Sequence, residues 1–336
     1  MFQGHPRTQV VAVSSGRAER AEKVAKEQGI AAHYTNFEEM LDKEKPDIVS
    51  IVTPPEFHCP MTLAALSRRI HVLCEKPFAL NVDEAKRMRS AADHAGMVAM
   101  IDYEFRFLPG RAYALELLRQ NYVGQIRMAH FVVRFGWRSQ ADDPPWDWWS
   151  DASRGGGALG ALGSHAVDTL WAMMGPPRRV FCELVAFVPE RSGKTVTSDD
   201  SYTLIVELES GARAVVQMTS AAGVNDAHFG IYGSEGQLTI PNLFALELYG
   251  GKRSDRRIGP IEIPEQYRLK VEEQPHTLRA PFRVLLGRMI HAIDNRLPSP
   301  TPDFNDALNS QAVLDAARLS SQERRWVEVD RSALLS

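Results

Sequence analysis

The sequence has 336 residues, and its 39 lysine and arginine residues against 42 aspartate and glutamate residues give a formal net charge of −3. A chain this balanced lacks the basic surface typical of nucleic-acid-binding proteins, and we expect neither a nucleic acid nor a membrane as partner. Hydrophobic residues at 44% and charged residues at 24% exclude a disordered or collagen-like chain. At about 150 residues per domain, the length predicts two domains.

The three cysteines of the chain are Cys59, Cys74 and Cys182, and no two of them have the C-x-x-C spacing of a zinc site. The first residues show neither the basic start nor the apolar segment of a signal peptide. No apolar run approaches the roughly 18 residues of a membrane span. We therefore expect a cytoplasmic protein without disulfide bonds and without a metal site.

Short apolar runs alternate with helical segments over the first hundred residues. Asn36 and Asn81 each precede a glutamate by three residues, which is the capping-box pattern at the start of a helix. The alternation predicts an α/β domain with a doubly wound parallel sheet. Strands are predicted at residues 9–13, 47–53, 70–74 and 97–102, and helices at 18–28, 37–44, 61–69 and 81–95.

The pattern changes near residue 126 to polar and apolar residues in alternation. Such alternation is typical of strands with one buried face, so we expect an α+β domain with a large, mostly antiparallel open sheet. Strands are predicted at residues 127–135, 179–188, 202–208 and 213–218, with a tight turn at 233–236, and helices at 282–295 and 303–321.

Polar and small residues follow the predicted parallel strands, at the edge where open parallel sheets bind ligands. They occupy residues 14–17, 53–58, 75–77 and 103–106. Lys76 stands out because Pro77 follows it, and a tight turn there would direct the lysine inward. A lysine in a cleft can give a proton or a hydrogen bond to a reacting oxygen. The alternative is an exposed lysine in a surface loop.

Several motifs carry a resemblance to one family. Glu75-Lys76-Pro77 follows an apolar strand, and Thr53-Pro54-Pro55-x-x-His58 lies one unit earlier. Further matches occur at residues 103–109, 155–168, 233–236 and 312–316. Together these segments, in this order, resemble the glucose–fructose oxidoreductase/inositol dehydrogenase (Gfo/Idh/MocA) family. The resemblance implies a Rossmann-like dinucleotide-binding domain over residues 1–104. Residues 105–336 would form an α+β domain for substrate binding and oligomerisation.

The resemblance also implies an NAD(P)-dependent oxidoreductase that acts on a secondary alcohol, or its ketone, of a sugar, polyol or related molecule. In the oxidation direction, His165 would take the hydroxyl proton and Lys76 would stabilise the developing alkoxide. The family further suggests a homo-oligomer. The residues expected to bind the cofactor are Ser15, Arg17, Thr53, Pro54, His58, Glu75, Lys76 and Arg106, and those expected to bind the substrate are Lys76, Trp148, Ser164 and His165.

Four tryptophans lie close together among charged residues, at positions 137, 146, 148 and 149. Aromatic faces beside charged groups suit a sugar ring, which has apolar C–H faces and polar hydroxyls. Packing beneath a long loop is the alternative interpretation of this cluster.

The cofactor preference is predicted from the end of the first strand, at Val13. NAD-specific sites carry an acidic residue there for the ribose 2′-hydroxyl, but this chain continues Ser14-Ser15-Gly16-Arg17. Small hydroxyls leave room for a phosphate, and Arg17 can meet its charge. We therefore expect NADP(H) to be favoured over NAD(H). The alternative is that Arg17 faces solvent at the start of a helix.

Two features depart from the family pattern. The family's first strand and glycine-rich turn have no counterpart before residue 9, so either the start codon is misassigned or the protein lacks this strand and turn. We consider the consequences of the second alternative. The strands at 9–13 and 47–53 would then have to pair with each other or with a strand from elsewhere, and dinucleotide binding would be weakened. The G-x-G-x-x-G at residues 155–160 is no substitute, because no strand is predicted before it.

The second departure concerns the residue four positions before His165, where the family commonly has aspartate and this chain has Ala161. Asp168 lies near the same helix face, with a structural ion pair or cap as the alternative role. Both departures favour a competing hypothesis, which is a non-catalytic ligand sensor or regulatory protein on the same fold. Retention of Lys76 and His165 favours the enzyme.

Overall fold

The computed structural model describes residues 2–269 and 278–330. Its N-terminal part alternates strands and helices as the sequence predicts, and all pairs among its strands are parallel. The strands are β1 (Ala12–Ser14), β2 (Ala32–Tyr34), β3 (Ile48–Ile51), β4 (His71–Cys74) and β5 (Ala99–Ile101). The helices are α1 (Ala18–Gln28), α2 (Phe37–Glu44), η1 (Pro55–Phe57), α3 (His58–Ser67) and α4 (Val82–Ala95).

Both capping asparagines act as predicted. The side chain of Asn36 accepts from the backbone N–H of Glu39, and that of Asn81 accepts from Glu84, each at 3.0 Å. These bonds satisfy N–H groups that the first turn of a helix leaves free. Helix α3, in contrast, begins at His58 rather than at residue 61, because η1 leads directly into it.

The parallel strands form two sheets rather than one. β1 pairs with β2, which the sequence analysis did not predict, and β3, β4 and β5 pair in that order. Among the described residues, β1 and β3 do not pair with each other, and neither gains another strand on its second edge. The expectation that these strands would close up or borrow a partner is therefore wrong for the described chain.

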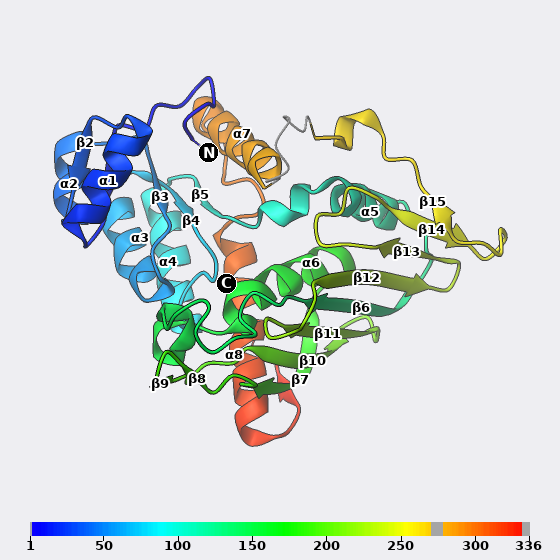
Figure 1. Cartoon of the computed structure of the whole chain (residues 1–336). Helices are drawn as coiled ribbons and strands as arrows, with labels where there is room; N and C mark the ends of the chain where they lie inside the picture. The colour runs from blue at the N-terminus through cyan, green and yellow to red at the C-terminus, as the bar shows by residue number, and fades with distance from the viewer. Residues whose placement is uncertain (1, 270–277, 331–336) are drawn as a thin grey trace.

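The C-terminal part is built on a nine-stranded sheet with the order β15-β14-β13-β12-β6-β11-β10-β7-β16 (Figure 1). All neighbours are antiparallel except β6 and β11. The four strand segments and the turn predicted from the sequence lie in this sheet, and β14 to β16 were not predicted. The strands are β6 (Ile126–Arg134), β7 (Pro177–Val185), β10 (Ser201–Leu208), β11 (Arg213–Thr219), β12 (Asp226–Gly233), β13 (Gly236–Ile240), β14 (Tyr249–Lys252), β15 (Gly259–Pro260) and β16 (Val327–Glu328). A separate hairpin pairs β8 (Glu190–Arg191) with β9 (Lys194–Thr195).

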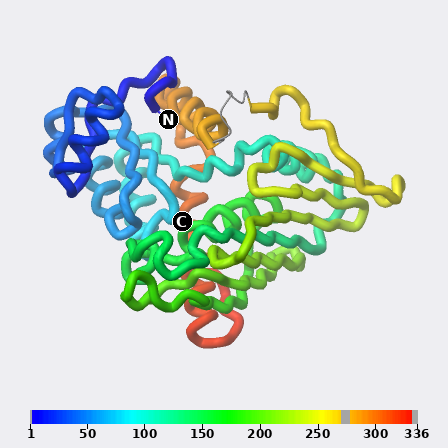
Figure 2. The backbone as a smooth tube through the Cα atoms, viewed as in Figure 1, coloured from blue at the N-terminus to red at the C-terminus, as the bar shows by residue number. Residues whose placement is uncertain are grey.

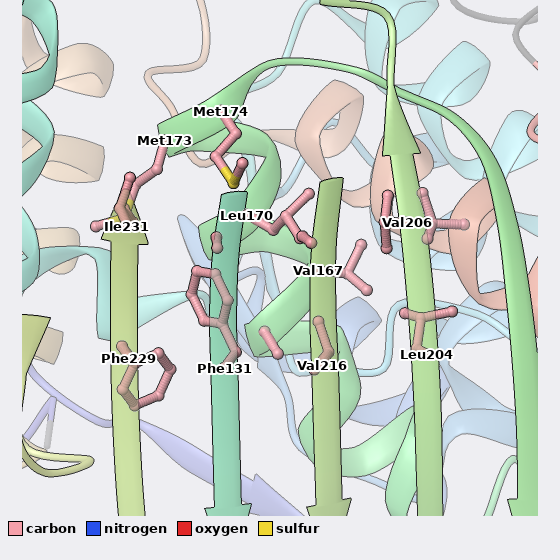
Figure 3. Close-up of a cluster of buried hydrophobic side chains, with 14 of the residues drawn as sticks. Phe131, Val167, Leu170, Met173, Met174, Leu204, Val206, Val216, Phe229 and Ile231 are labelled. Carbon is pink, nitrogen blue, oxygen red and sulfur yellow. The ribbon is translucent and has the colours of Figure 1, made fainter. Parts of the chain in front are cut away.

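Helix α6 (Ser164–Met174) covers the centre of this sheet. Figure 3 shows apolar side chains of α6 lying against strands β12, β6, β11 and β10. The helix contributes Val167, Leu170, Met173 and Met174, and the sheet contributes Phe131, Leu204, Val206, Val216, Phe229 and Ile231. Every one of these side chains is buried. Their removal from water fixes the position of α6, and with it the residues at the start of the helix.

Helix α7 (Arg279–Asn295) returns to the N-terminal sheet and buries Leu285 and Met289 against Leu73 and Met100. Near the N-terminus, Phe2 packs edge-on against Phe282 of α7, which explains why these segments lie side by side in Figure 2. Helix α8 (Phe304–Glu323) has residues in both hydrophobic cores. The division at residues 104 and 105 stays a prediction.

The N-terminal part is followed along the chain by η2 (Glu104–Phe107) and α5 (Pro109–Arg119). Two 3₁₀ turns, η3 (Trp148–Ser150) and η4 (Ala152–Arg154), precede α6. The π-helical turn η5 (Leu159–Gly163) then leads directly into α6. A further 3₁₀ turn is η6 (Glu265–Tyr267). The three cysteines are buried and free. None of the helices in the described ranges is long and apolar enough to cross a membrane.

The packing of α6 on the sheet leads to a stability prediction. Replacing Phe131, which is 1% exposed, by alanine leaves a cavity under α6. We expect the free energy of unfolding to fall by about 3–5 kcal/mol. Met128→Ala on the same strand is the matched control, because Met128 is 44% exposed. Guanidinium unfolding followed by circular dichroism measures both variants, and equal losses would contradict the packing described.

Candidate active site

Lys76 reaches from the end of β4 into the C-terminal part of the chain. Its Nζ donates to the carbonyl oxygen of Ala161 at 3.3 Å, and its backbone N–H donates to the carboxylate of Glu75 at 3.1 Å. The Lys76–Pro77 peptide bond is cis. Lys76 is half-buried, so its side chain is directed inward as the sequence predicts, and it ends one helical turn before His165.

His58 links the two loops beside Lys76. One ring nitrogen lies 2.7 Å from the carbonyl oxygen of Thr53, and the other lies 2.9 Å from that of Pro77. The side chain of His58 has no exposed surface. Thr53 and Pro54 lie at the end of β3 and are half-buried. The ring of His58 therefore holds the loops after β3 and β4 at a fixed spacing, and its expected contact with the cofactor stays a prediction.

His165 lies in the first turn of α6, packed between aromatic rings. Its imidazole stacks on Phe105 at 4.1 Å between centroids and meets the edge of Tyr103 at 5.8 Å. Burial, together with the positive charges of Lys76 and Arg111, holds the pKa of His165 well below its ordinary value. A neutral imidazole is the form that can accept a proton. Its Nδ1 is buried without a hydrogen-bond partner among the described residues.

Ala161 supplies a backbone oxygen where a carboxylate was expected. The buried carboxylate nearest in sequence, Asp168, pairs with the guanidinium of Arg106, with 2.8 Å between Nε and Oδ2. The same guanidinium donates to Asp306 at 2.9 Å. Burial raises the pKa of Asp168 to about 6, although Arg106 opposes this shift. The ion-pair alternative for Asp168 is therefore confirmed.

Arg106 is consequently bound to two carboxylates, and its side chain is only 13% exposed. Its expected contact with the cofactor stays a prediction. Arg111 lies in the first turn of α5. Its side chain is buried between Phe105 and Phe229 and donates to the hydroxyl of Thr169 at 3.1 Å. The sequence analysis did not single out Arg111, because nothing in the sequence marks a buried arginine.

A second group that the sequence analysis did not single out follows β5. Asp102 and Glu104 are 4% and 8% exposed, and both belong to the surroundings of Lys76. The sequence could have indicated them, because two residues with carboxyl groups directly follow the buried apolar strand β5. Such a position places them at the same sheet edge as Glu75 and Lys76.

The glycine-rich segment joins the two parts of the chain. A 3₁₀ turn, η4, precedes it, so the rejection of the G-x-G-x-x-G as a dinucleotide fingerprint is confirmed. Gly155 has φ +80°, and a Cβ there would lie 2.8 Å from Pro55. Beside it, Arg154 donates to Glu56 at 2.8 Å. The segment therefore packs directly on the loop that follows β3.

The tryptophan cluster surrounds a buried arginine. Trp137 and Trp149 meet edge-to-face at 4.9 Å, and Arg138 lies over both rings. Arg138 also pairs with Asp147 at 2.9 Å. These contacts support the packing interpretation for Trp137 and Trp149. Trp148 is half-buried beside Trp149, and its contact with substrate stays a prediction.

The remaining predicted residues differ in their surroundings. Ser164 adjoins His165 and is completely buried, and its hydroxyl has no partner in the described chain. Ser15 and Arg17 follow β1 on the separate two-stranded sheet, where Ser15 Oγ accepts from the backbone N–H of Arg17 at 3.3 Å. Arg17 is exposed and precedes α1, where its guanidinium is available to solvent or to a ligand.

Comparison with known proteins agrees with this fold. Residues 1–103 match the model of the oxidoreductase family with an NAD-binding Rossmann fold, and residues 112–239 match the GFO/IDH/MocA C-terminal domain. An uncharacterized oxidoreductase of Synechocystis sp. is 30% identical over 345 residues, which cover 98% of this chain and 91% of the relative.

Two solved structures extend the comparison. Levoglucosan dehydrogenase in complex with NADH has a TM-score of 0.88 at 23% identity, covering 98% of this chain and 92% of its own. An oxidoreductase domain protein from Kribbella flavida has a TM-score of 0.87 at 27% identity, covering 95% and 90%. Fold and site define an NAD-binding oxidoreductase with a Rossmann-like domain and a mixed, mostly antiparallel second sheet. The chain belongs to the Gfo/Idh/MocA family. That the family's first strand is missing from this protein stays a prediction.

The buried charge cluster gives a second stability prediction. Arg106→Ala would leave Asp168 and Asp306 without their shared cation, and we expect a loss of about 3–5 kcal/mol in the free energy of unfolding. Arg134→Ala is the control, since Arg134 pairs with Asp226 on the surface, where about 1 kcal/mol or less is at stake. Chemical unfolding compares the two. A loss as small as that of the control would show that Arg106 does not hold these elements together.

Proposed function

We propose that the protein is an NAD(P)-dependent oxidoreductase that transfers a hydride to or from a secondary alcohol or ketone of a sugar, a polyol or a related small molecule. The observation that carries the proposal is the contact of Lys76 Nζ with the carbonyl oxygen of Ala161. It brings the lysine of one part of the chain beside the helix turn that presents His165 from the other. The positive charge of Lys76 also acts on the neutral imidazole of His165, which supports a shared role for the two groups.

The residues present suit the nicotinamide half of a cofactor. The loops after β3 and β4 are held together by His58, and the buried hydroxyl of Ser164 lacks a partner in the described chain. When bound, a nicotinamide cofactor accepts or supplies the hydride. Thr53, Pro54, Glu75 and Lys76 would hold it, with Arg106 and His58 behind them.

The chain's own residues handle the proton and the charge on oxygen. In the oxidation direction, His165 accepts the hydroxyl proton, which its neutral form permits. Lys76 places its ammonium group against the oxygen as negative charge develops there. In the opposite direction His165 returns the proton. Both groups are positioned by packing, since α6 is fixed to the sheet and Lys76 to the end of β4.

We infer a carbohydrate-like substrate, contacted by Lys76, Trp148, Ser164 and His165. The support comes from relatives, because levoglucosan dehydrogenase is known in complex with NADH and levoglucosan or L-sorbose. The half-buried indole of Trp148 and the unpartnered buried hydroxyl of Ser164 are the kinds of group that bind the C–H faces and the hydroxyls of a sugar ring. We further propose a cytoplasmic homo-oligomer, in line with the family.

The proposal for Lys76 is tested by Lys76→Ala. Loss of one group of this kind lowers the rate by roughly 10²–10⁴-fold, whereas cofactor affinity should change far less. Screening a panel of sugars and polyols with both cofactors identifies a substrate, and stopped-flow absorbance of the reduced nicotinamide measures the rate. Lys26→Ala, on the exposed face of α1, is the control. Equal rates in the variant and the parent would falsify the assignment. Sugar binding without turnover by any substrate would favour the ligand-sensor alternative.

The cofactor proposal is that NADP(H) binds more tightly than NAD(H), through Ser15 and Arg17. Arg17→Ala should weaken NADPH binding by roughly tenfold to a hundredfold, the usual effect of losing a charge-assisted hydrogen bond. NADH binding by the same variant is the internal control and should be unchanged. Fluorescence titration measures both. A clear preference of the parent protein for NADH would overturn the proposal.

A further inference from the structure

Asp102 and Glu104 form a buried carboxyl pair next to Lys76. Each residue is more than nine-tenths buried, and the backbone N–H of Asp102 donates to the carbonyl oxygen of Cys74 at 2.8 Å, which places the pair beside the end of β4. Asp102 Oδ1 and Glu104 Oε2 have no hydrogen-bond partner among the described residues, and each carboxyl group acts on the other. Two ionised carboxylates in contact, removed from water, repel each other strongly. A proton held between them removes this repulsion and gives one oxygen a donor.

The charges that face the pair come from several elements. Glu75 and Lys76, after β4, act on both carboxyl groups, and Cys74 at the end of β4 lies within reach of Asp102. From α5, the guanidinium of Arg111 interacts with Glu104. Glu75 adds negative charge to this group, and Lys76 and Arg111 add positive charge. The net charge around Lys76 therefore depends on how many protons the carboxyl pair holds.

We propose that Asp102 and Glu104 are positioning residues, which share a proton and thereby set the negative charge that faces the ammonium group of Lys76. When both carboxyl groups are protonated, the ammonium group of Lys76 donates to the carbonyl oxygen of Ala161 and is free to donate to the substrate oxygen. When Glu104 ionises, its carboxylate attracts the ammonium group away from that oxygen. The position of Lys76, and with it the rate of hydride transfer, would then follow the protonation of Glu104.

The order in which the two groups ionise supports this role. Burial raises the pKa of both, that of Glu104 to about 7. Once one group of the pair is ionised, its negative charge disfavours a second charge beside it, so the second proton is held to a higher pH. The pair therefore passes from two protons to one near neutral pH, with one proton remaining on the pair.

Infrared spectroscopy tests the pair without any substrate, because a protonated carboxyl group has a C=O stretch distinct from that of a carboxylate. The parent protein should lose one such band near pH 7 and retain another at pH 8. Glu104→Gln should lack the step near pH 7, and Asp102→Asn should lack the band at pH 8. Glu22→Gln, an exposed residue of α1, should keep both.

Circular dichroism establishes that each variant is folded. If Glu104→Gln fails to fold, the band at pH 8 in the parent and its loss in Asp102→Asn decide the matter. A parent spectrum without a protonated carboxyl band at pH 8 would overturn the proposal. So would a step near pH 7 that persists in a folded Glu104→Gln.

A kinetic arm, which rests on the proposed function, tests the effect on Lys76. The parent's kcat should fall as the pH rises through the ionisation of Glu104, and Glu104→Gln should lose that decrease while Glu22→Gln retains it. Unchanged profiles in all three proteins would contradict the positioning role. If no substrate is turned over by the parent, the proposed function fails, whereas the infrared result still decides whether the pair shares a proton.

Discussion

A single buried guanidinium joins the three elements that build the candidate site. Arg106, in η2, binds Asp168 of α6 and Asp306 of α8. Because buried carboxylates are unfavourable without a cation, the meeting of these elements at Arg106 stabilises their packing. Asp168 follows His165 by three residues, and Glu104 precedes Arg106 by two. The ion pair therefore fixes the imidazole and the carboxyl pair relative to each other.

The elements that the sequence predicts best are those with local signals. Helices α2 and α4 were predicted with nearly correct bounds because the capping asparagine and the helical spacing lie within the segment itself. Strand β2 was not predicted, since Ala32, His33 and Tyr34 form no apolar run and are held by pairing with β1. The division of the parallel strands into two sheets is likewise a matter of pairing between distant segments, which no local pattern encodes.

The site shows the same limit. The placement of Lys76, Glu75 and His58 near one another could be predicted because they follow strands, and the ends of parallel strands meet at one edge. The partners of Arg106 lie 62 and 200 residues away in the sequence, so only the folded chain identifies them. The protonation of Asp102 and Glu104 depends on burial, which is a property of the packed chain. Their carboxyl groups are visible in the sequence, but their charge is not.

Helix α8 has a consequence for how the molecule moves. Phe304, Ala307 and Leu308 belong to the core beside the parallel strands, whereas Ala312 to Ala317 contribute to the core of the nine-stranded sheet. The helix contains no proline or glycine at which it would kink. Rotation of the N-terminal part against the C-terminal part would therefore expose the apolar residues that α8 buries in one of these two cores, at a cost in free energy.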